Sequence, residues 1–205
     1  TEAARAGARV VASARGRGNQ LHAGAAAARG DWLLFLHADT VPGPGFAAAV
    51  ARFIADPANR ARAGESSCEG TPTGVTRASD DAPLSGRAGF FRLRLDDPAR
   101  AARFVERLAN WRADALGLPY GDQGLLIARA LYESAGGFPP LPIMEDVALV
   151  RKLGRRRLVQ LEAELVTSAE RYRRDGYLLR PLRNLVCLAL YFLGVAPERL
   201  ARFYG

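Results

Sequence analysis

The segment Trp32-Leu33-Leu34-Phe35-Leu36, which runs directly into His37-Ala38-Asp39-Thr40, decides how the chain is interpreted. Five consecutive large apolar residues predict a strand buried on both faces, as in a parallel sheet covered by helices. Ligands gather at the carboxyl ends of such strands, and Asp39 follows that end. A lone aspartate there is more often a turn or cap. Because a second acidic pair, Glu145-Asp146, occurs later in the chain, we expect the two acidic sites to form one active centre.

Length and composition indicate one enzyme-sized domain. The 205 residues are 49% hydrophobic, which favours a single core and one domain over residues 1–205. The net charge of +8 comes almost wholly from arginine, since Lys152 is the only lysine. Guanidinium groups suit diphosphates, which they grip with two parallel hydrogen bonds. The basic residues are scattered except at 155–157 and 171–174, which we interpret as solvated faces, so nucleic acid is not an expected partner.

Cysteine and histidine usage limits the other classes. Cys68 and Cys187 are too few for a disulfide framework, which favours a reducing, cytoplasmic compartment. His22 and His37 are too few for a structural zinc site. The apolar stretch 185–195 is shorter than the about 20 residues that span a bilayer. We therefore expect the C-terminal helical segment 181–205 to pack on the domain or to contact a membrane peripherally.

Strand and helix patterns alternate along the chain. Apolar runs predict strands near 9–12, 32–36, 91–95, 124–128, 158–161 and 165–168, whereas helical spacing predicts helices near 2–6, 20–29, 46–54, 104–115, 130–135, 147–153 and 182–193. This order predicts an α/β sandwich around a mostly parallel sheet. Residues 57–86 lack an apolar period and are interpreted as a loop insertion that is poorly ordered without ligand. Gly16-Arg17-Gly18 is either a plain turn or a phosphate-binding turn at a helix start.

Several short motifs, in this order, resemble the family-two glycosyltransferases with the GT-A nucleotide-sugar-binding fold. They are Gly16-Arg17-Gly18-Asn19-Gln20, Phe35-Leu36-His37-Ala38-Asp39-Thr40, Gly121-Asp122-Gln123-Gly124, Gly136-Gly137-Phe138 and Met144-Glu145-Asp146. Within that family they look most like a bacterial subgroup linked to arsenosugar biosynthesis. The resemblance implies that the family's first strand would precede Thr1 and is missing here. It also implies that residues 57–86 are inserted.

The resemblance further implies a metal-assisted, inverting transfer of a sugar from a nucleotide-diphosphate donor to a hydroxyl acceptor. Asp39 would hold Mg²⁺ or Mn²⁺ at the last acidic position of the family's Asp-x-Asp motif, where His37 replaces the first aspartate. Asp146 would be the general base that takes the acceptor proton, with Glu145 beside it as an orienting group. The expected substrate-binding residues are Arg17, Gln20, His37, Asp122 and Gln123.

Two other functions stay open at this point. A sugar nucleotidyltransferase shares the broad architecture but attacks phosphorus, and the Glu145-Asp146 pair argues against it. A non-catalytic module that binds a membrane or partner surface would use the basic face and the apolar stretch 185–195. Helix capping is the structural alternative for Glu145 and Asp146, because acids are favoured in a first helical turn.

Overall fold

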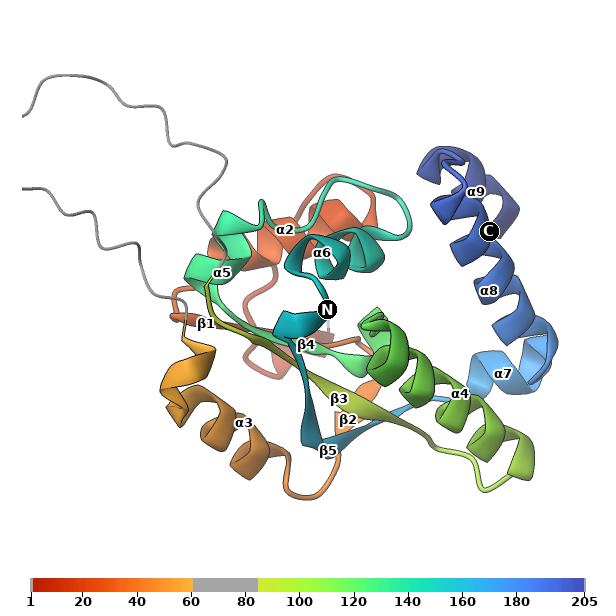
Figure 1. The fold of residues 1–205 in the computed structure, drawn as a ribbon, viewed down its shortest axis with the longest axis horizontal. Helices are drawn as coiled ribbons and strands as arrows, with labels where there is room; N and C mark the ends of the chain where they lie inside the picture. Colours follow the sequence, from red (N-terminus) through yellow and green to blue (C-terminus); the bar gives the residue numbers. More distant parts are fainter. Residues whose placement is uncertain (1, 61–84, 205) are drawn as a thin grey trace, which may run out of the picture.

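The computed structural model describes residues 2–60 and 85–204, so most of the predicted insertion lies outside the described residues. In this part of the chain, a five-stranded sheet is flanked by helices (Figure 1). The strands are β1 (Trp32–Phe35), β2 (Thr40–Pro42), β3 (Ala88–Leu95), β4 (Leu125–Ala128) and β5 (Leu158–Thr167). The α-helices are α1 (Glu2–Arg5), α2 (Arg17–Ala27), α3 (Phe46–Ala55), α4 (Arg100–Leu116), α5 (Arg129–Ser134), α6 (Glu145–Leu153), α7 (Glu170–Asp175), α8 (Leu179–Phe192) and α9 (Pro197–Tyr204). Short 3₁₀ turns are η1 (Pro57–Asn59), η2 (Gly121–Gln123) and η3 (Arg155–Arg157).

The α/β class is confirmed, but the expectation of a mostly parallel sheet is wrong for the described strands. The strand order is β1-β4-β3-β5-β2, and only β3 and β5 pair in parallel. The other three pairings, β1 with β4, β4 with β3, and β5 with β2, are antiparallel. Apolar runs do not report strand direction, because β4, which is antiparallel to both of its neighbours, is as buried as a parallel strand would be. β1, β3 and β5 nevertheless point the same way, so their carboxyl ends lie at one edge.

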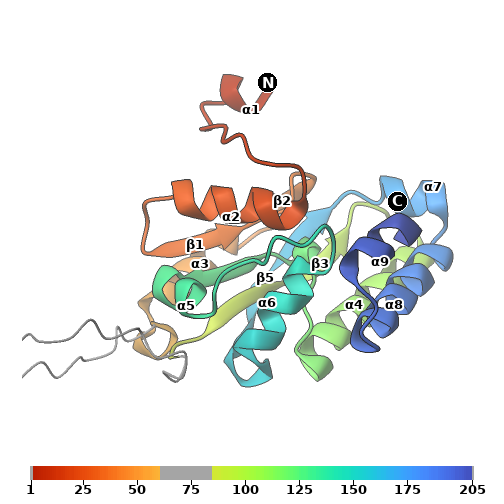
Figure 2. The same cartoon turned by 90° about the horizontal axis from the view of Figure 1, so that it is seen from above.

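Apolar side chains fill both faces of the sheet. On one face, α2, α5 and α6 pack over β1 and β4 through a cluster that includes Ala25, Ile127, Leu131 and Leu149. On the other, α3 packs on β5 through Phe53 and Leu165. The amphipathic helix α4 covers the carboxyl half of β3 and ends at Gly117, whose φ of 63° suits glycine. Figure 2 shows the sheet between these helices, with α8 and α9 beside them.

Three local predictions are corrected. Residues 9–12 form no strand. Their side chains are exposed, and no described strand pairs with their backbone. The two strands predicted at 158–161 and 165–168 are the single strand β5, because charged Glu162 and Glu164 point to the exposed side of its alternating pattern. The run in β1 is not buried on both faces: Leu33 is buried, whereas Leu34 is 39% exposed at the edge of the described sheet.

The C-terminal segment contains more helix than predicted. The short helix α7 precedes α8, and α9 follows it. Pro181 lies in the first turn of α8 rather than before it, where its missing N–H removes no intrahelical hydrogen bond. Cys187 and Leu188 of α8 are buried against Val147 and Val150 of α6, so the predicted packing of this helix on the domain is confirmed. No described helix is both long and apolar enough to cross a membrane.

Candidate active site

The turn between β1 and β2 brings His37 and Asp39 to the carboxyl edge of the sheet. The backbone N–H of Ser168, just beyond β5, donates a hydrogen bond to the carbonyl oxygen of Asp39 at 3.2 Å. The hydroxyl groups of Thr40 and Thr167 lie 2.9 Å apart and join the two strands on the same side. The Asp39 turn is therefore fixed to the end of β5, and the prediction that Asp39 follows a strand end is confirmed.

The second acidic pair begins α6. Met144 precedes it with a φ of 65°, the left-handed conformation that a residue with a side chain adopts at a cost of about 1–3 kcal/mol. Asp146 accepts hydrogen bonds from the backbone N–H of Gly121 on Oδ2 and of Val147 on Oδ1, both at 2.8 Å. Each carboxylate oxygen keeps a further lone pair. Asp146 thus combines a capping contact with free acceptor capacity.

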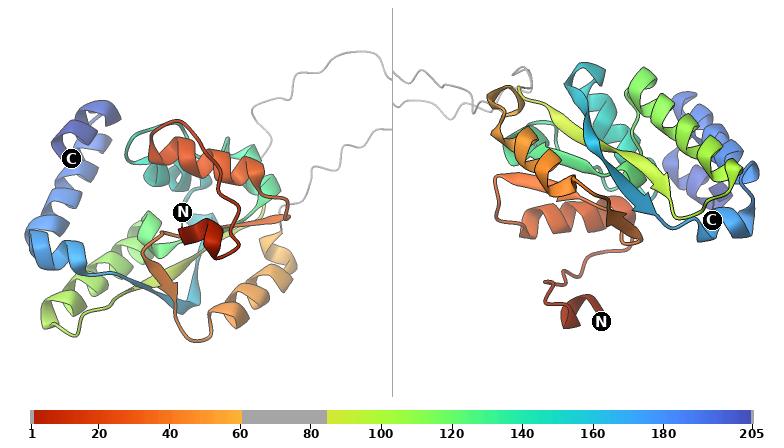
Figure 3. Two further views of the ribbon diagram at one scale, coloured as in Figure 1. Left: turned by 180° about the vertical axis from the view of Figure 1, so that it is seen from behind. Right: turned by 90° about the horizontal axis from the view of Figure 1, so that it is seen from below.

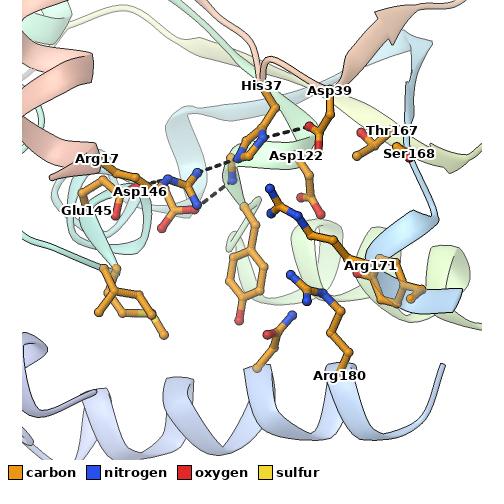
Figure 4. Close-up of a pocket in the computed structure, with 16 residues that line it drawn as sticks. Arg17, His37, Asp39, Asp122, Glu145, Asp146, Thr167, Ser168, Arg171 and Arg180 are labelled. Atoms are coloured by element: carbon orange, nitrogen blue, oxygen red, sulfur yellow. Dashed lines mark hydrogen bonds and ion pairs between the residues drawn. The ribbon is translucent and has the colours of Figure 1, made fainter. Parts of the chain in front are cut away.

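Arg17 connects the two acidic sites, as Figure 4 shows. Its Nε lies 3.0 Å from Oε1 of Glu145, and its Nη2 lies 2.9 Å from Nε2 of His37. The other ring nitrogen of His37, Nδ1, lies 2.9 Å from Oδ1 of Asp39. An unbroken series of polar contacts therefore runs from Asp39 through His37 and Arg17 to Glu145, which agrees with the expectation of one centre.

Gly18 explains why Arg17 reaches this position. A Cβ atom on Gly18 would lie 2.0 Å from the carbonyl oxygen of Pro139, in the loop that leads to Met144. Only glycine lets the first turn of α2 pack this closely, and its N–H donates to the carbonyl oxygen of Leu141 at 3.3 Å. Gly18 therefore serves helix-to-loop packing, which favours the plain-turn interpretation of Gly16-Arg17-Gly18 over phosphate binding by its amides.

Two carboxyl groups at the centre have raised pKa values. Burial, together with the charge of Asp146, raises the pKa of Glu145 to about 7, although Arg17 opposes the shift. Burial also raises the pKa of Asp122, although Arg112 opposes the shift. Oδ1 of Asp122 is buried and has no hydrogen-bond partner among the described residues. Both groups are thus held in surroundings that disfavour their charged forms.

A cavity of about 150 Å³ lies between these residues and the C-terminal helices. Its polar wall includes Arg17, His37, Asp39, Asp122 and Asp146, while Tyr120 and Tyr172 supply aromatic surface. A smaller, mostly apolar cavity adjoins it and shares Arg17, His37, Tyr120, Gly121 and the Glu145-Asp146 pair. The larger cavity is therefore lined by charged groups, and the smaller cavity beside it is mostly apolar.

Two predicted substrate-binding residues lie elsewhere. Gln123 is fully buried and lines neither cavity; its Nε2 donates to the carbonyl oxygen of Phe91 and to Oδ1 of Asn110. The structural-turn alternative therefore replaces substrate binding for Gln123. Gln20 is exposed on α2, three residues after Arg17, and lines neither cavity.

Sequence reasoning missed the opposite wall. Arg171 of α7 and Arg180 of α8 line the cavity with Asn184, and Figure 4 shows both guanidinium groups reaching into it. Arg180 is held by an ion pair from Nη1 to Oδ2 of Asp175 at 2.8 Å and is only 11% exposed. The interpretation of residues 171–174 as a purely solvated face is therefore wrong for Arg171. The arginine excess was the signal in the sequence that could have indicated this wall.

The donor set bears on the predicted metal. Among residues 2–60 and 85–204, no three His, Cys, Asp or Glu side chains form a group that could hold a metal ion. Asp39 offers one carboxylate, 32% exposed, with Oδ1 engaged by His37. Mg²⁺ is commonly held by one or two carboxylates together with substrate phosphates and water. These residues therefore fit a cation shared with a phosphate ligand, not one enclosed by protein groups alone.

Comparison with known families finds one model that matches the amino-terminal part of the chain. Residues 3–101 match the model described as glycosyl transferase family 2. The match contains Arg17, His37 and Asp39 and ends before Asp122, Glu145 and Asp146. It supports a glycosyltransferase, and the curled mixed sheet between helices agrees with the GT-A class. Searches of curated proteins and of solved structures each found no match to the chain. The narrower arsenosugar subgroup gains no support from these comparisons.

Proposed function

We propose that this protein is a glycosyltransferase that inverts the anomeric centre in a single displacement, with a nucleotide-diphosphate sugar as donor and a hydroxyl group as acceptor. The proposal rests on one observation: two acidic sites, Asp39 and the Glu145-Asp146 pair, line the same cavity. Asp39 shares the cavity with Arg171 and Arg180, which can bind a diphosphate. Asp146 also lines the cavity, and its carboxylate oxygens can accept further hydrogen bonds.

The donor side would be stabilised by positive charge. As the bond between the sugar C1 and the diphosphate oxygen breaks, negative charge grows on the leaving group. Arg171 and Arg180 line the same cavity as Asp39 and can donate charge-assisted hydrogen bonds to phosphate oxygens. Mg²⁺ or Mn²⁺ shared between Asp39 and the diphosphate would add Lewis-acid stabilisation of that charge.

The acceptor side needs a base on the face of the sugar opposite the leaving group. We assign this role to Asp146, whose two backbone hydrogen bonds fix its carboxylate without using all of its lone pairs. Glu145 is almost fully buried and is paired with Arg17, so it is better suited to positioning than to direct contact with acceptor. Asp122, with its unpartnered buried oxygen, is a candidate for binding a sugar hydroxyl.

The decisive experiment compares two substitutions in the full-length protein. Asp39→Ala should remove metal-dependent donor binding, measured by calorimetry with a panel of nucleotide sugars and Mn²⁺. Asp146→Asn should preserve that binding but lower the single-turnover rate with acceptor by about 10²–10⁴-fold, the usual effect of losing a general base. Near-normal turnover in Asp146→Asn would remove Asp146 as the base.

The released product distinguishes the reaction types. A glycosyltransferase releases a nucleoside diphosphate, whereas a sugar nucleotidyltransferase consumes or forms pyrophosphate. Following both products with the unmodified protein therefore tests the reaction class independently of any residue assignment. Release of pyrophosphate alone would favour the nucleotidyltransferase.

A further inference from the structure

Helix α8 is oriented opposite to an ordinary surface helix. Two of its polar side chains, Arg180 and Asn184, line the cavity, and Arg180 is paired with Asp175, whereas the side chain of Arg183 is 36% exposed. Its exposed side chains are large and apolar, and this apolar stripe consists of Leu178, Leu179, Leu182, Leu185, Val186, Phe192 and Leu193. The most exposed members retain 56–80% of their accessible surface. Surface helices normally place charged residues on that side.

The orientation of α8 is fixed by packing. Cys187 and Leu188 are buried in a cluster with Leu118, Val147 and Val150, which attaches the middle of the helix to α6. Asp175 accepts from Arg180 at the start of the helix. Figures 1 and 3 show α8 at the outer edge of the molecule, with no other described element beyond it. The apolar stripe is therefore a stable exposed surface.

The charge around the apolar stripe indicates what covers it. Residues 176–197 contain two arginines and no acidic residue. Residues 170–204 contain seven arginines against three acidic residues, which accounts for half of the net charge of +8. Apolar residues flanked by excess positive charge suit an anionic lipid surface, where the apolar side enters the boundary between headgroups and acyl chains.

A second exposed apolar row provides a contrast. On α4, Phe104, Leu108 and Trp111 are 42–58% exposed, but charged Arg107 and Asp114 are exposed among them. Insertion of α4 would desolvate those charges, one of them acidic, whereas the charged residues of α8, Arg180 and Arg183, are both basic and have side chains only 11% and 36% exposed. A single helix of 14 residues also offers a narrow strip, which suits shallow insertion better than the roughly 800 Å² per partner of a standard protein interface.

We propose that α8 docks the protein on an anionic membrane surface through the apolar stripe. The helix would lie in the plane of the interface, since it is too short to cross the bilayer. Because its inner face lines the cavity, docking brings the cavity within one helix diameter of the lipid headgroups. This inference does not depend on the proposed transfer reaction.

Vesicle flotation of the full chain tests the proposal. We expect the protein to float with vesicles of phosphatidylcholine mixed with phosphatidylglycerol, and to bind pure phosphatidylcholine at least tenfold more weakly. Replacing Leu179, Leu182 and Leu185 together with glutamine, a good helix former, should lower the partition coefficient by roughly 100-fold. The matched control replaces Phe104, Leu108 and Trp111 of α4 with glutamine and should bind as the parent does.

Three results would overturn the proposal. The first is no flotation of the unmodified protein with anionic vesicles, which needs no variant and so stands even if a variant misfolds. The second is equal loss of binding in the α8 and α4 variants when both melt like the parent. The third is a dimer by light scattering that the α8 substitutions convert to monomer, because a second copy of the chain would then cover the apolar stripe.

Discussion

Replacing Glu145 with glutamine should stabilise the protein at alkaline pH and change its stability little at acidic pH. Glu145 is 1% exposed, and its pKa rises from 4.5 to about 7 because of burial and the nearby charge of Asp146. Arg17 offsets only part of this effect. Above about pH 7, the folded protein must therefore hold a buried carboxylate that the unfolded chain exposes to water.

The sign and size follow from proton linkage. Between pH 4.5 and about 7, the folded state binds the Glu145 proton more tightly than the unfolded state does. The free energy of unfolding therefore falls as pH rises through this window. A shift from 4.5 to about 7 corresponds to about 3 kcal/mol in total, most of which is lost between about pH 5 and pH 8. Glutamine keeps the shape of the side chain but cannot ionise.

Urea denaturation at roughly pH 5 and pH 8 measures the effect, with stability extrapolated linearly to water. The stability gained by Glu145→Gln should be larger at the higher pH by about 2–3 kcal/mol. The matched control is Glu164→Gln on the exposed side of β5, which should give the same small difference at both pH values. If the pH profiles of the parent and Glu145→Gln ran parallel, the argument from burial would be refuted.

Three further substitutions test the scaffold and the anion wall. Gly18→Ala should destabilise the fold by about 1–3 kcal/mol in thermal or urea unfolding, because its Cβ would overlap the Pro139 carbonyl oxygen; a neutral effect would contradict the close packing. Asn110→Ala should cost about 2–4 kcal/mol in the same assay, since the backbone N–H and carbonyl of Leu93 lose their buried partner; an unchanged midpoint would rule this out. Arg171→Ala should weaken calorimetric binding of a nucleoside diphosphate about tenfold, and unaltered affinity would remove Arg171 from the proposed donor site.

Local signals in the sequence located the elements that carry the acidic groups. A short apolar run predicted β1, and the polar residues after it had to lie near a strand end, which fixed Asp39. Helical spacing after Met144 placed Glu145 and Asp146 in the first turn of α6. Both inferences concern residues adjacent in the chain, where backbone geometry alone decides position. The direction of strand pairing depends on distant partners, and for this reason the predicted parallel sheet was wrong.

The residues whose positions the sequence did not predict share one property. Whether each is buried, exposed or in the cavity depends on the direction of its side chain in the folded protein. Gln123 follows a glycine and an aspartate in a turn-like segment, yet β3 and α4 enclose it with Asn110, an arrangement that only tertiary packing reveals. On α8, apolar residues occur on both the buried and the exposed sides, so periodicity alone cannot select the inward face. The structure resolves the ambiguity through Arg180, which would have no anionic partner on the outside but meets Asp175 on the inside. That pairing, together with the burial of Cys187 and Leu188 against α6, turns Arg180 toward the cavity and leaves Leu179, Leu182 and Leu185 outside.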